Sequence, residues 1–215
     1  MPRLSWLVAL AGIAGLCWFA LRMLPPEWDP RAPLDLTATP NLVTSFKLAR
    51  VRRDPAFCRA AFEASRIPVT RVPDRASEVG CEIGNAMRLP SALRVSPSTP
   101  IVTCPVAAAW VLYERNVLLP AGITGVAHLG THACRNVNHA ASGRRSQHAT
   151  ANAIDIAGFT RAGGEWRVAR DWDQPGLRAL RDGACRSFNA VLSPDYNAAH
   201  RDHLHLDMGR ARICR

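Results

Sequence analysis

The chain has 215 residues, 48% of them hydrophobic, and carries a formal net charge of +10. This size and composition exclude a disordered chain and favour one folded domain of about 160 residues once the terminal segments are set aside. The charge reflects either genome composition or attraction to an anionic partner. No helix-turn-helix, zinc-finger or aromatic stacking pattern is present, so a nucleic-acid partner is not expected.

Residues 4–21 form an uncharged apolar run bracketed by Arg3 and Arg22. Eighteen helical residues span about 27 Å, close to the thickness of a bilayer core. The Arg-Met-Leu-Pro-Pro stretch that follows lacks the small residues of a signal-peptidase site. We therefore predict that residues 1–24 are an uncleaved transmembrane signal anchor, with the rest of the chain outside the cytoplasm.

Residues 25–53 hold five prolines and are expected to form an extended tether. The sequence Leu34-Asp-Leu36 within it is expected to pack on the domain that follows. Asp54 and Pro55 are typical of a helix N-cap and first turn, so the folded domain is predicted over residues 54–215.

The remaining pattern predicts an α+β domain with a small antiparallel sheet flanked by helices. The region 67–96 is broken by prolines and glycines, which favours short strands and turns. Helices are expected over 54–65, 103–116 and 174–192. Strands are expected over 122–134, 153–159, 165–170 and 203–207.

Six cysteines follow the apolar run. Their number is even, and they contain no CxxC pair. This pattern favours three disulfides in an oxidising compartment over a zinc module, the alternative being buried free thiols. Nearest neighbours suggest one of the 15 possible pairings: Cys58–Cys81, Cys104–Cys134 and Cys185–Cys214.

All seven histidines lie between residues 128 and 205. His148 and Asp155 are seven residues apart across a turn into an apolar strand, where an unpaired carboxylate is costly. His205 comes from a separate short strand. Two imidazoles and a carboxylate suit zinc, and three protein ligands leave the fourth tetrahedral position open, as in catalytic sites.

The strand that carries His205 supplies further candidates. Asp202 is expected to act as general base near the metal, and His203 either contacts the reacting group or orients Asp202. Asp207 is expected to hold the second nitrogen of a ligand histidine. His200 is expected to lie on the surface.

The motif Ser146-x-His148 through Asp155, followed by His203-Leu-His205, resembles that of the zinc D-Ala-D-Ala metallopeptidase superfamily, which includes the hedgehog signalling domain. Together with Cys134-Arg135 and the final Cys214-Arg215, the chain from about residue 33 is similar to the bacterial extensin-like C-terminal domain family.

The resemblance implies a hedgehog-like or D-Ala-D-Ala-peptidase-like fold, zinc at the three ligands, and Asp202 or His203 as the base. It also implies that Arg135 grips a substrate carboxylate or oxyanion, with Arg144 and Arg145 as alternatives. Ala151 stands where the superfamily has glycine, so a positive φ there would be strained.

The expected protein is a zinc peptidase held in the inner membrane through residues 4–21, acting in the periplasm on peptidoglycan peptides. A zinc-stabilised domain that binds the cell wall or a partner without catalysis is the first alternative. The second is a disulfide-stapled structural protein whose histidines serve only the fold.

Overall fold

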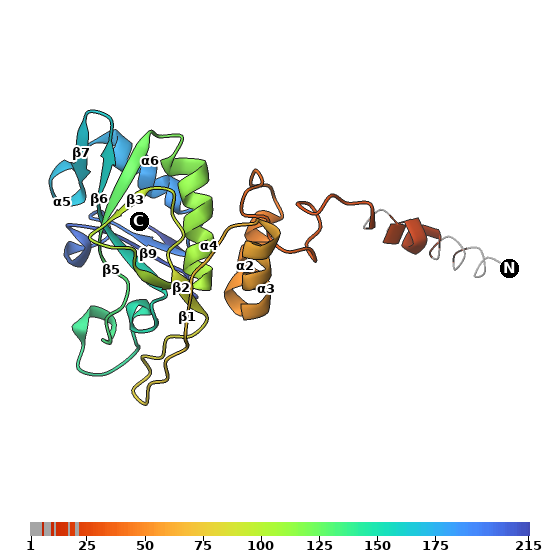
Figure 1. Ribbon diagram of the computed structural model, residues 1–215, viewed down its shortest axis with the longest axis horizontal. Coiled ribbons are helices and arrows are strands. Elements are labelled where there is room, and N and C mark those ends of the chain that lie inside the picture. Colours follow the sequence, from red (N-terminus) through yellow and green to blue (C-terminus); the bar gives the residue numbers. More distant parts are fainter. Residues whose placement is uncertain (1–5, 7–9, 11, 17, 20–21) are drawn as a thin grey trace.

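A mixed sheet and a fully buried helix organise the α+β fold of the computed structural model, which describes residues 6, 10, 12–16, 18, 19 and 22–215. Helix α4 (Cys104–Tyr113) packs against the sheet, and α2 (Thr44–Arg53) and α3 (Pro55–Ala64) lie on its other side (Figure 1). All ten residues of α4 are buried, as expected of a helix that is apolar all round.

The larger sheet has seven strands in the order β10-β8-β9-β6-β5-β3, and β7 pairs with the far end of β6. Its centre is antiparallel, but the β3–β5 and β8–β10 pairs are parallel, so the sheet is larger and more mixed than predicted. The strands are β3 (Arg94–Ser96), β5 (Ile123–Gly130), β6 (Ala153–Arg161), β7 (Gly164–Arg167), β8 (Ala190–Leu192), β9 (Leu204–Asp207) and β10 (Ile213–Cys214).

A smaller sheet of three antiparallel strands lies beside the start of α4. It is formed by β1 (Arg71–Val72), β2 (Ala86–Arg88) and β4 (Ile101–Thr103). Strands β1, β2 and β3 lie in the region 67–96, where short strands and turns were expected, and β4 follows that region.

Helix α3 begins as the sequence predicts, because the Asp54 side chain accepts a hydrogen bond from the Phe57 N–H at 3.0 Å. Helix α4 is followed by a short π-helix, η1 (Glu114–Leu118). Thr103 does not cap α4 with its side chain; its hydroxyl donates to the Asn152 side chain instead.

The expected tether is only partly extended, because its last ten residues form α2. Leu34 and Leu36 are buried, as predicted. The single lysine, Lys47, is also buried, and its ammonium group donates to the carbonyl oxygens of Pro26 and Pro33. These hydrogen bonds hold the segment before residue 54 together, and apolar contacts and the Leu36 N–H, which donates to the Ser65 hydroxyl at 2.7 Å, dock it on the domain.

Two predicted elements near the C-terminus differ from those observed. The helix expected over 174–192 ends at residue 184 as α6 (Pro175–Ala184), and β8 follows. The strand expected over 165–170 stops at Arg167, where α5 (Val168–Asp171) begins. Strand β8 forms because it pairs with β9 and β10, which lie later in the chain, and β7 ends at Arg167, the last residue of its hairpin pairing with β6.

Three disulfides form, but two of the predicted pairs are wrong. The observed bonds join Cys58 to Cys104, Cys81 to Cys134 and Cys185 to Cys214, so only the last pair is confirmed. Cys58 lies on α3, which packs on α4 where Cys104 begins it. The nearest-neighbour pairing fails because helix packing brings Cys58 and Cys104 together across 46 residues, which leaves Cys81 to pair with Cys134.

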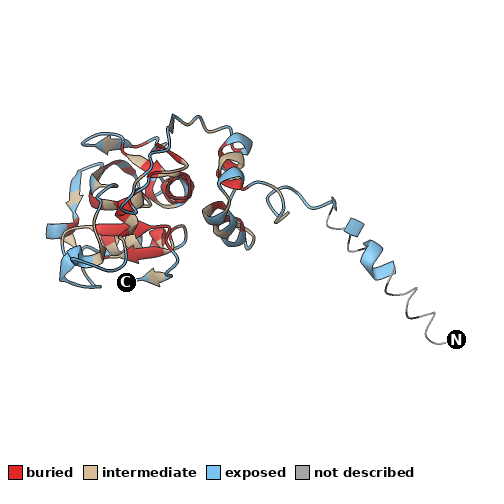
Figure 2. Ribbon diagram, turned by 90° about the horizontal axis from the view of Figure 1, so that it is seen from below, coloured by how far each residue is buried: buried red, intermediate tan, exposed pale blue. Residues whose placement is uncertain are grey.

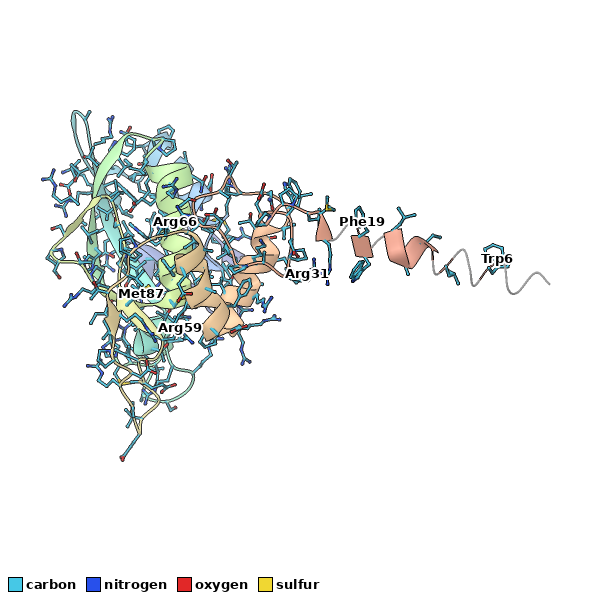
Figure 3. The ribbon with its side chains drawn as sticks, turned by 45° about the vertical axis from the view of Figure 1, so that its right-hand side comes forward. Trp6, Phe19, Arg31, Arg59, Arg66 and Met87 are labelled. Atoms are coloured by element: carbon cyan, nitrogen blue, oxygen red, sulfur yellow. A yellow bond between two sulfur atoms is a disulfide. The ribbon has the colours of Figure 1, made fainter. Side chains whose placement is uncertain are left out.

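No helix among the described residues is long and apolar enough to cross a membrane. Half of the residues of the anchor predicted over 4–21 lie outside the described part of the chain. Where the segment is described, it is helical and exposed, and Trp6 and Phe19 lie on the extension that leads away from the sheet (Figure 3). Figure 2 shows the contrast between this exposed segment and the buried helix and strands of the domain.

Candidate metal centre

Strand pairing places two of the three predicted ligands face to face. Strands β6 and β9 run antiparallel, and Asp155 lies directly opposite His205. Side chains at such positions are about 5 Å apart at Cβ. Leu204 and Leu206 alternate with His205 and enter the core, so His205 projects from the opposite face of the sheet.

The third ligand comes from a short 3-10 helix, η3 (Gln147–Thr150), between β5 and β6. The Ser146 hydroxyl accepts from the His148 N–H and caps this helix. Ala151 ends it in the left-handed conformation at φ 56° and is fully buried. Ala151 therefore has the positive φ at which an alanine is strained, where the resembling superfamily has glycine, at a cost of about 1–2 kcal/mol.

The three donor atoms form a compact triangle. Nε2 of His148 lies 3.1 Å from Oδ1 of Asp155 and 3.0 Å from Nδ1 of His205, and the third side measures 2.9 Å. Each imidazole is held from behind: Nδ1 of His148 by the Thr131 carbonyl at 3.2 Å, and Nε2 of His205 by Asp207 at 3.0 Å.

These outer hydrogen bonds fix the tautomers. Nδ1–H of His148 donates to Thr131 and Nε2–H of His205 donates to Asp207, so both inward nitrogens present lone pairs beside the Asp155 carboxylate. Three electron-rich atoms about 3 Å apart repel one another unless a positive charge lies among them. A proton or a metal ion can supply that charge.

The donor set fits zinc. Donor atoms bound to tetrahedral zinc at about 2.0–2.1 Å lie about 3.3 Å apart, slightly wider than the observed triangle. Among the described residues, these three form the group of His, Cys, Asp or Glu side chains arranged to hold a metal. The three atoms would serve as three of the four ligands of a tetrahedral zinc ion.

The pKa values of His205 and Asp155 are both shifted by the hydrogen bonds within the site. Burial opposes the charged form of His205, but its hydrogen bonds to Asp155 and Asp207 outweigh burial and raise its pKa to about 9. Burial also disfavours the Asp155 carboxylate, yet the bonds to both histidines lower its pKa well below the usual range. In the metal-free protein at neutral pH, His205 is therefore protonated beside the ionised Asp155, and a bound metal ion would replace that proton.

Asp202 and His203 form a pair beside the triangle. Nδ1 of His203 lies 2.8 Å from Oδ1 of Asp202, and its Nε2 lies 3.6 Å from Oδ1 of Asp155. The bond to His203 lowers the pKa of Asp202. Of the two candidate bases, His203 therefore presents its free nitrogen to the metal centre, and Asp202 holds the opposite nitrogen.

His200 is not a simple surface residue. It is half-buried, and its ring centroid lies 5.2 Å from that of His203 and 5.8 Å from that of His205. Burial, followed by the charges of His205 and His203, lowers its pKa to about 4. His200 is consequently neutral at physiological pH and adds an uncharged wall to the site.

A cleft of about 720 Å³ opens beside the metal centre, and His203 and His205 contribute to its lining. Five arginines also line it: Arg52, Arg135, Arg144, Arg145 and Arg210. The sequence singled out Arg135, Arg144 and Arg145. Arg52 and Arg210 were missed because their positions on α2 and after β9 carry no local signal that they face the same cleft.

Three arginines of the cleft belong to residues 131–146, here called the arginine loop. The Cys81–Cys134 disulfide closes one end of it. Across the loop, the Arg135 carbonyl accepts from the Ser146 N–H at 3.0 Å. The Arg145 guanidinium donates to Asn136 and Val79, and both Arg135 and Arg145 line the cleft.

The comparison with protein families supports the resemblance to the extensin-like C-terminal domain family. The model of the family described as extensin-like protein C-terminus matches residues 56–215. No curated protein and no solved structure matches the chain. Because the matched region covers most of the sequence and includes the whole candidate metal centre, the chain belongs to the extensin-like protein C-terminus family.

Proposed function

We propose that this protein is a zinc-dependent peptidase that acts on peptidoglycan peptides in the cell envelope. The observation that carries the proposal is the triangle of His148, Asp155 and His205 with the free nitrogen of His203 beside it. A site that only stabilised the fold would have its fourth position closed by protein. The similarity to D-Ala-D-Ala metallopeptidases, seen in the motif spacing, supports the same chemistry.

Each residue has a role that its contacts support. His148, Asp155 and His205 would hold zinc, which when bound supplies Lewis-acid activation of water and of a carbonyl group. His203 accepts a proton at Nε2 and returns it to the leaving amine, while Asp202 fixes its tautomer through Nδ1. Arg135 binds a substrate carboxylate at the cleft wall.

The location proposed is the periplasmic face of the inner membrane, with residues 4–21 as the anchor. Three disulfides are typical of an oxidising compartment. The terminal segment has large apolar residues, such as Trp6, Leu10 and Ile13, of which more than half the surface area is exposed. A bilayer would cover them, and the basic domain suits an anionic surface.

The test uses the full-length protein in detergent, measured for zinc content and for cleavage of soluble muropeptides. His148→Ala is expected to lose both zinc and cleavage. His203→Ala is expected to keep zinc and to lose cleavage by about 10²–10⁴-fold, the usual contribution of a general base. His132→Ala, an exposed histidine of the same region, is the matched control and should change neither.

The outcomes separate the candidate functions. Zinc binding with no muropeptide cleavage by the wild type would support a zinc-stabilised binding domain. Carefully prepared protein without zinc would favour the structural protein whose histidines serve only the fold. Unchanged cleavage by His148→Ala would refute the enzymatic proposal directly.

A further inference from the structure

The cleft beside the metal centre has almost no negative charge to balance its arginines. Asp207 is the one acidic residue among the described residues that line it. Both of its carboxylate oxygens are engaged, Oδ1 by the Gly209 N–H at 2.7 Å and Oδ2 by Nε2 of His205 at 3.0 Å. Among the described residues that line the cleft, no carboxylate is therefore free to pair with the arginines, and an anionic ligand would neutralise them.

These arginines fall into two groups with different supports. Arg135, Arg144 and Arg145 belong to the arginine loop, which is tied to residues 79 and 81. Arg52 comes from α2 and donates to the Gly209 carbonyl at 3.3 Å, while Arg210 follows Gly209 in the chain. The second group is thus built on the turn that leads out of β9, directly behind the Asp207 that supports His205.

Arg52 is held in an environment that favours an anion. Its Nε atom is buried and has no hydrogen-bond partner. Burial is the main reason that its pKa lies below the ordinary value, and the charges of Arg53, Arg210 and Arg212 add to the effect. A buried N–H without an acceptor is costly, and neighbouring like charges add repulsion. An oxyanion bound in the cleft beside this guanidinium group would offset the repulsion.

We infer that Arg52 and Arg210 form a second anion-binding subsite of the cleft, which holds a side-chain or backbone carboxylate of a peptide substrate. The inference rests on the proposed function, because it names the substrate as a peptide with at least two carboxylates. The arginine loop takes one of them, and the Arg52–Arg210 subsite takes the other. Guanidinium groups bind carboxylates through paired N–H donors.

The experiment measures binding of two synthetic stem peptides to the full-length protein in detergent by calorimetry. Both have the sequence Ala-γ-D-Glu-Lys-D-Ala, with the glutamate α-carboxylate either free or converted to an amide. The wild type is expected to bind the free acid about tenfold more tightly, the order expected for one charged hydrogen-bonded contact. Arg52→Gln and Arg210→Gln should each abolish that preference.

Arg53→Gln and Arg212→Gln are the matched controls. Both arginines repel Arg52, but neither lines the cleft, so their loss removes the same charge without removing a ligand contact. They should retain the preference for the free acid. Arg210 is exposed, and therefore Arg210→Gln tests the subsite even if Arg52→Gln disturbs the contact with Gly209.

Several outcomes would overturn the subsite. These are equal effects of all four substitutions, no effect of Arg52→Gln and Arg210→Gln, no binding of either peptide by the wild type, or displacement of both peptides alike by inorganic phosphate. Binding is read without turnover. A protein that discriminates the two peptides but does not cleave them would contradict the proposed catalysis and leave the subsite standing.

Discussion

The metal centre and the arginine loop face the same cleft but are held by different means. Asp155 and His205 sit on paired strands, and each donor atom is oriented by a second hydrogen bond or by strand register. The arginine loop has little regular structure and depends on one disulfide and a few backbone contacts. Asp155 and His205 are thus fixed by the sheet, and His148 is held by η3 and the Thr131 carbonyl, whereas the charged wall is fixed by a cross-link that needs an oxidising compartment.

Removing that cross-link should separate the two regions most strongly. In the double variant Cys81→Ser/Cys134→Ser, the chain-entropy model for a 53-residue separation gives a loss of about 4 kcal/mol in unfolding free energy. The variant that remains folded should still bind one zinc but bind carboxylate peptides more weakly. Denaturant unfolding and zinc analysis measure the two effects.

If zinc binding is lost together with peptide binding in the folded variant, the two regions are one cooperative unit. The double variant Cys185→Ser/Cys214→Ser is the control. It should also be less stable, since that disulfide closes a 29-residue separation. Peptide binding should nevertheless weaken less than in the Cys81→Ser/Cys134→Ser variant, because the arginine loop is untouched and the pairing of β10 with β8 still holds the tail that carries Arg210.

The pH dependence of the metal-free protein tests the metal centre alone. The pKa of His205 is raised from an ordinary 6.5 to about 9, so its stabilisation is complete below pH 6.5 and is lost as the pH rises through 9. The loss is on the order of 3 kcal/mol. Asp155, with its lowered pKa, stabilises above about pH 4 and loses its contribution in acid.

Chelator-treated protein should therefore unfold more easily at pH 9 than at pH 6, as measured by denaturant titration. Zinc-loaded protein should not show this decline, because the metal occupies the lone pair that would otherwise bind the proton. An identical pH profile with and without zinc would mean that His205 is not a ligand.

Asp207 tests how far the outer hydrogen bond supports the metal centre. Asp207→Ala removes the acceptor that orients His205, and losses of this kind usually weaken metal affinity about 10–100-fold. Competition with a chelator measures the change. Asp173→Ala, at a fully exposed carboxylate, should leave zinc affinity unchanged. Equal affinities for both variants would show that strand register alone orients the imidazole.

Ala151→Gly should have the smallest effect. Glycine relieves the left-handed strain of about 1–2 kcal/mol. It also loses a buried methyl group, about 0.8 kcal/mol, and adds backbone entropy to the unfolded chain. The net change in unfolding free energy should lie within about 1 kcal/mol of zero in thermal or denaturant unfolding. A larger stabilisation would mean that the turn carrying His148 is more strained than its geometry implies.

The sequence by itself determined the features that repeat over a few residues. The alternation of His205 with Leu204 and Leu206, the cap at Asp54 and the helix over α3 follow from local periodicity and side-chain chemistry. The grouping of histidines and the spacing from His148 to Asp155 were enough to select the three residues that the fold brings together.

Only the tertiary structure decided which remote segments meet. The packing of α3 on α4 selected the partner of Cys58, and pairing with β9 turned the end of an expected helix into β8. Contacts across the fold likewise faced His203 toward the metal centre and brought Arg52 to Gly209. Local patterns set the conformation of a segment, but which segments lie together depends on burial and pairing summed over the whole chain.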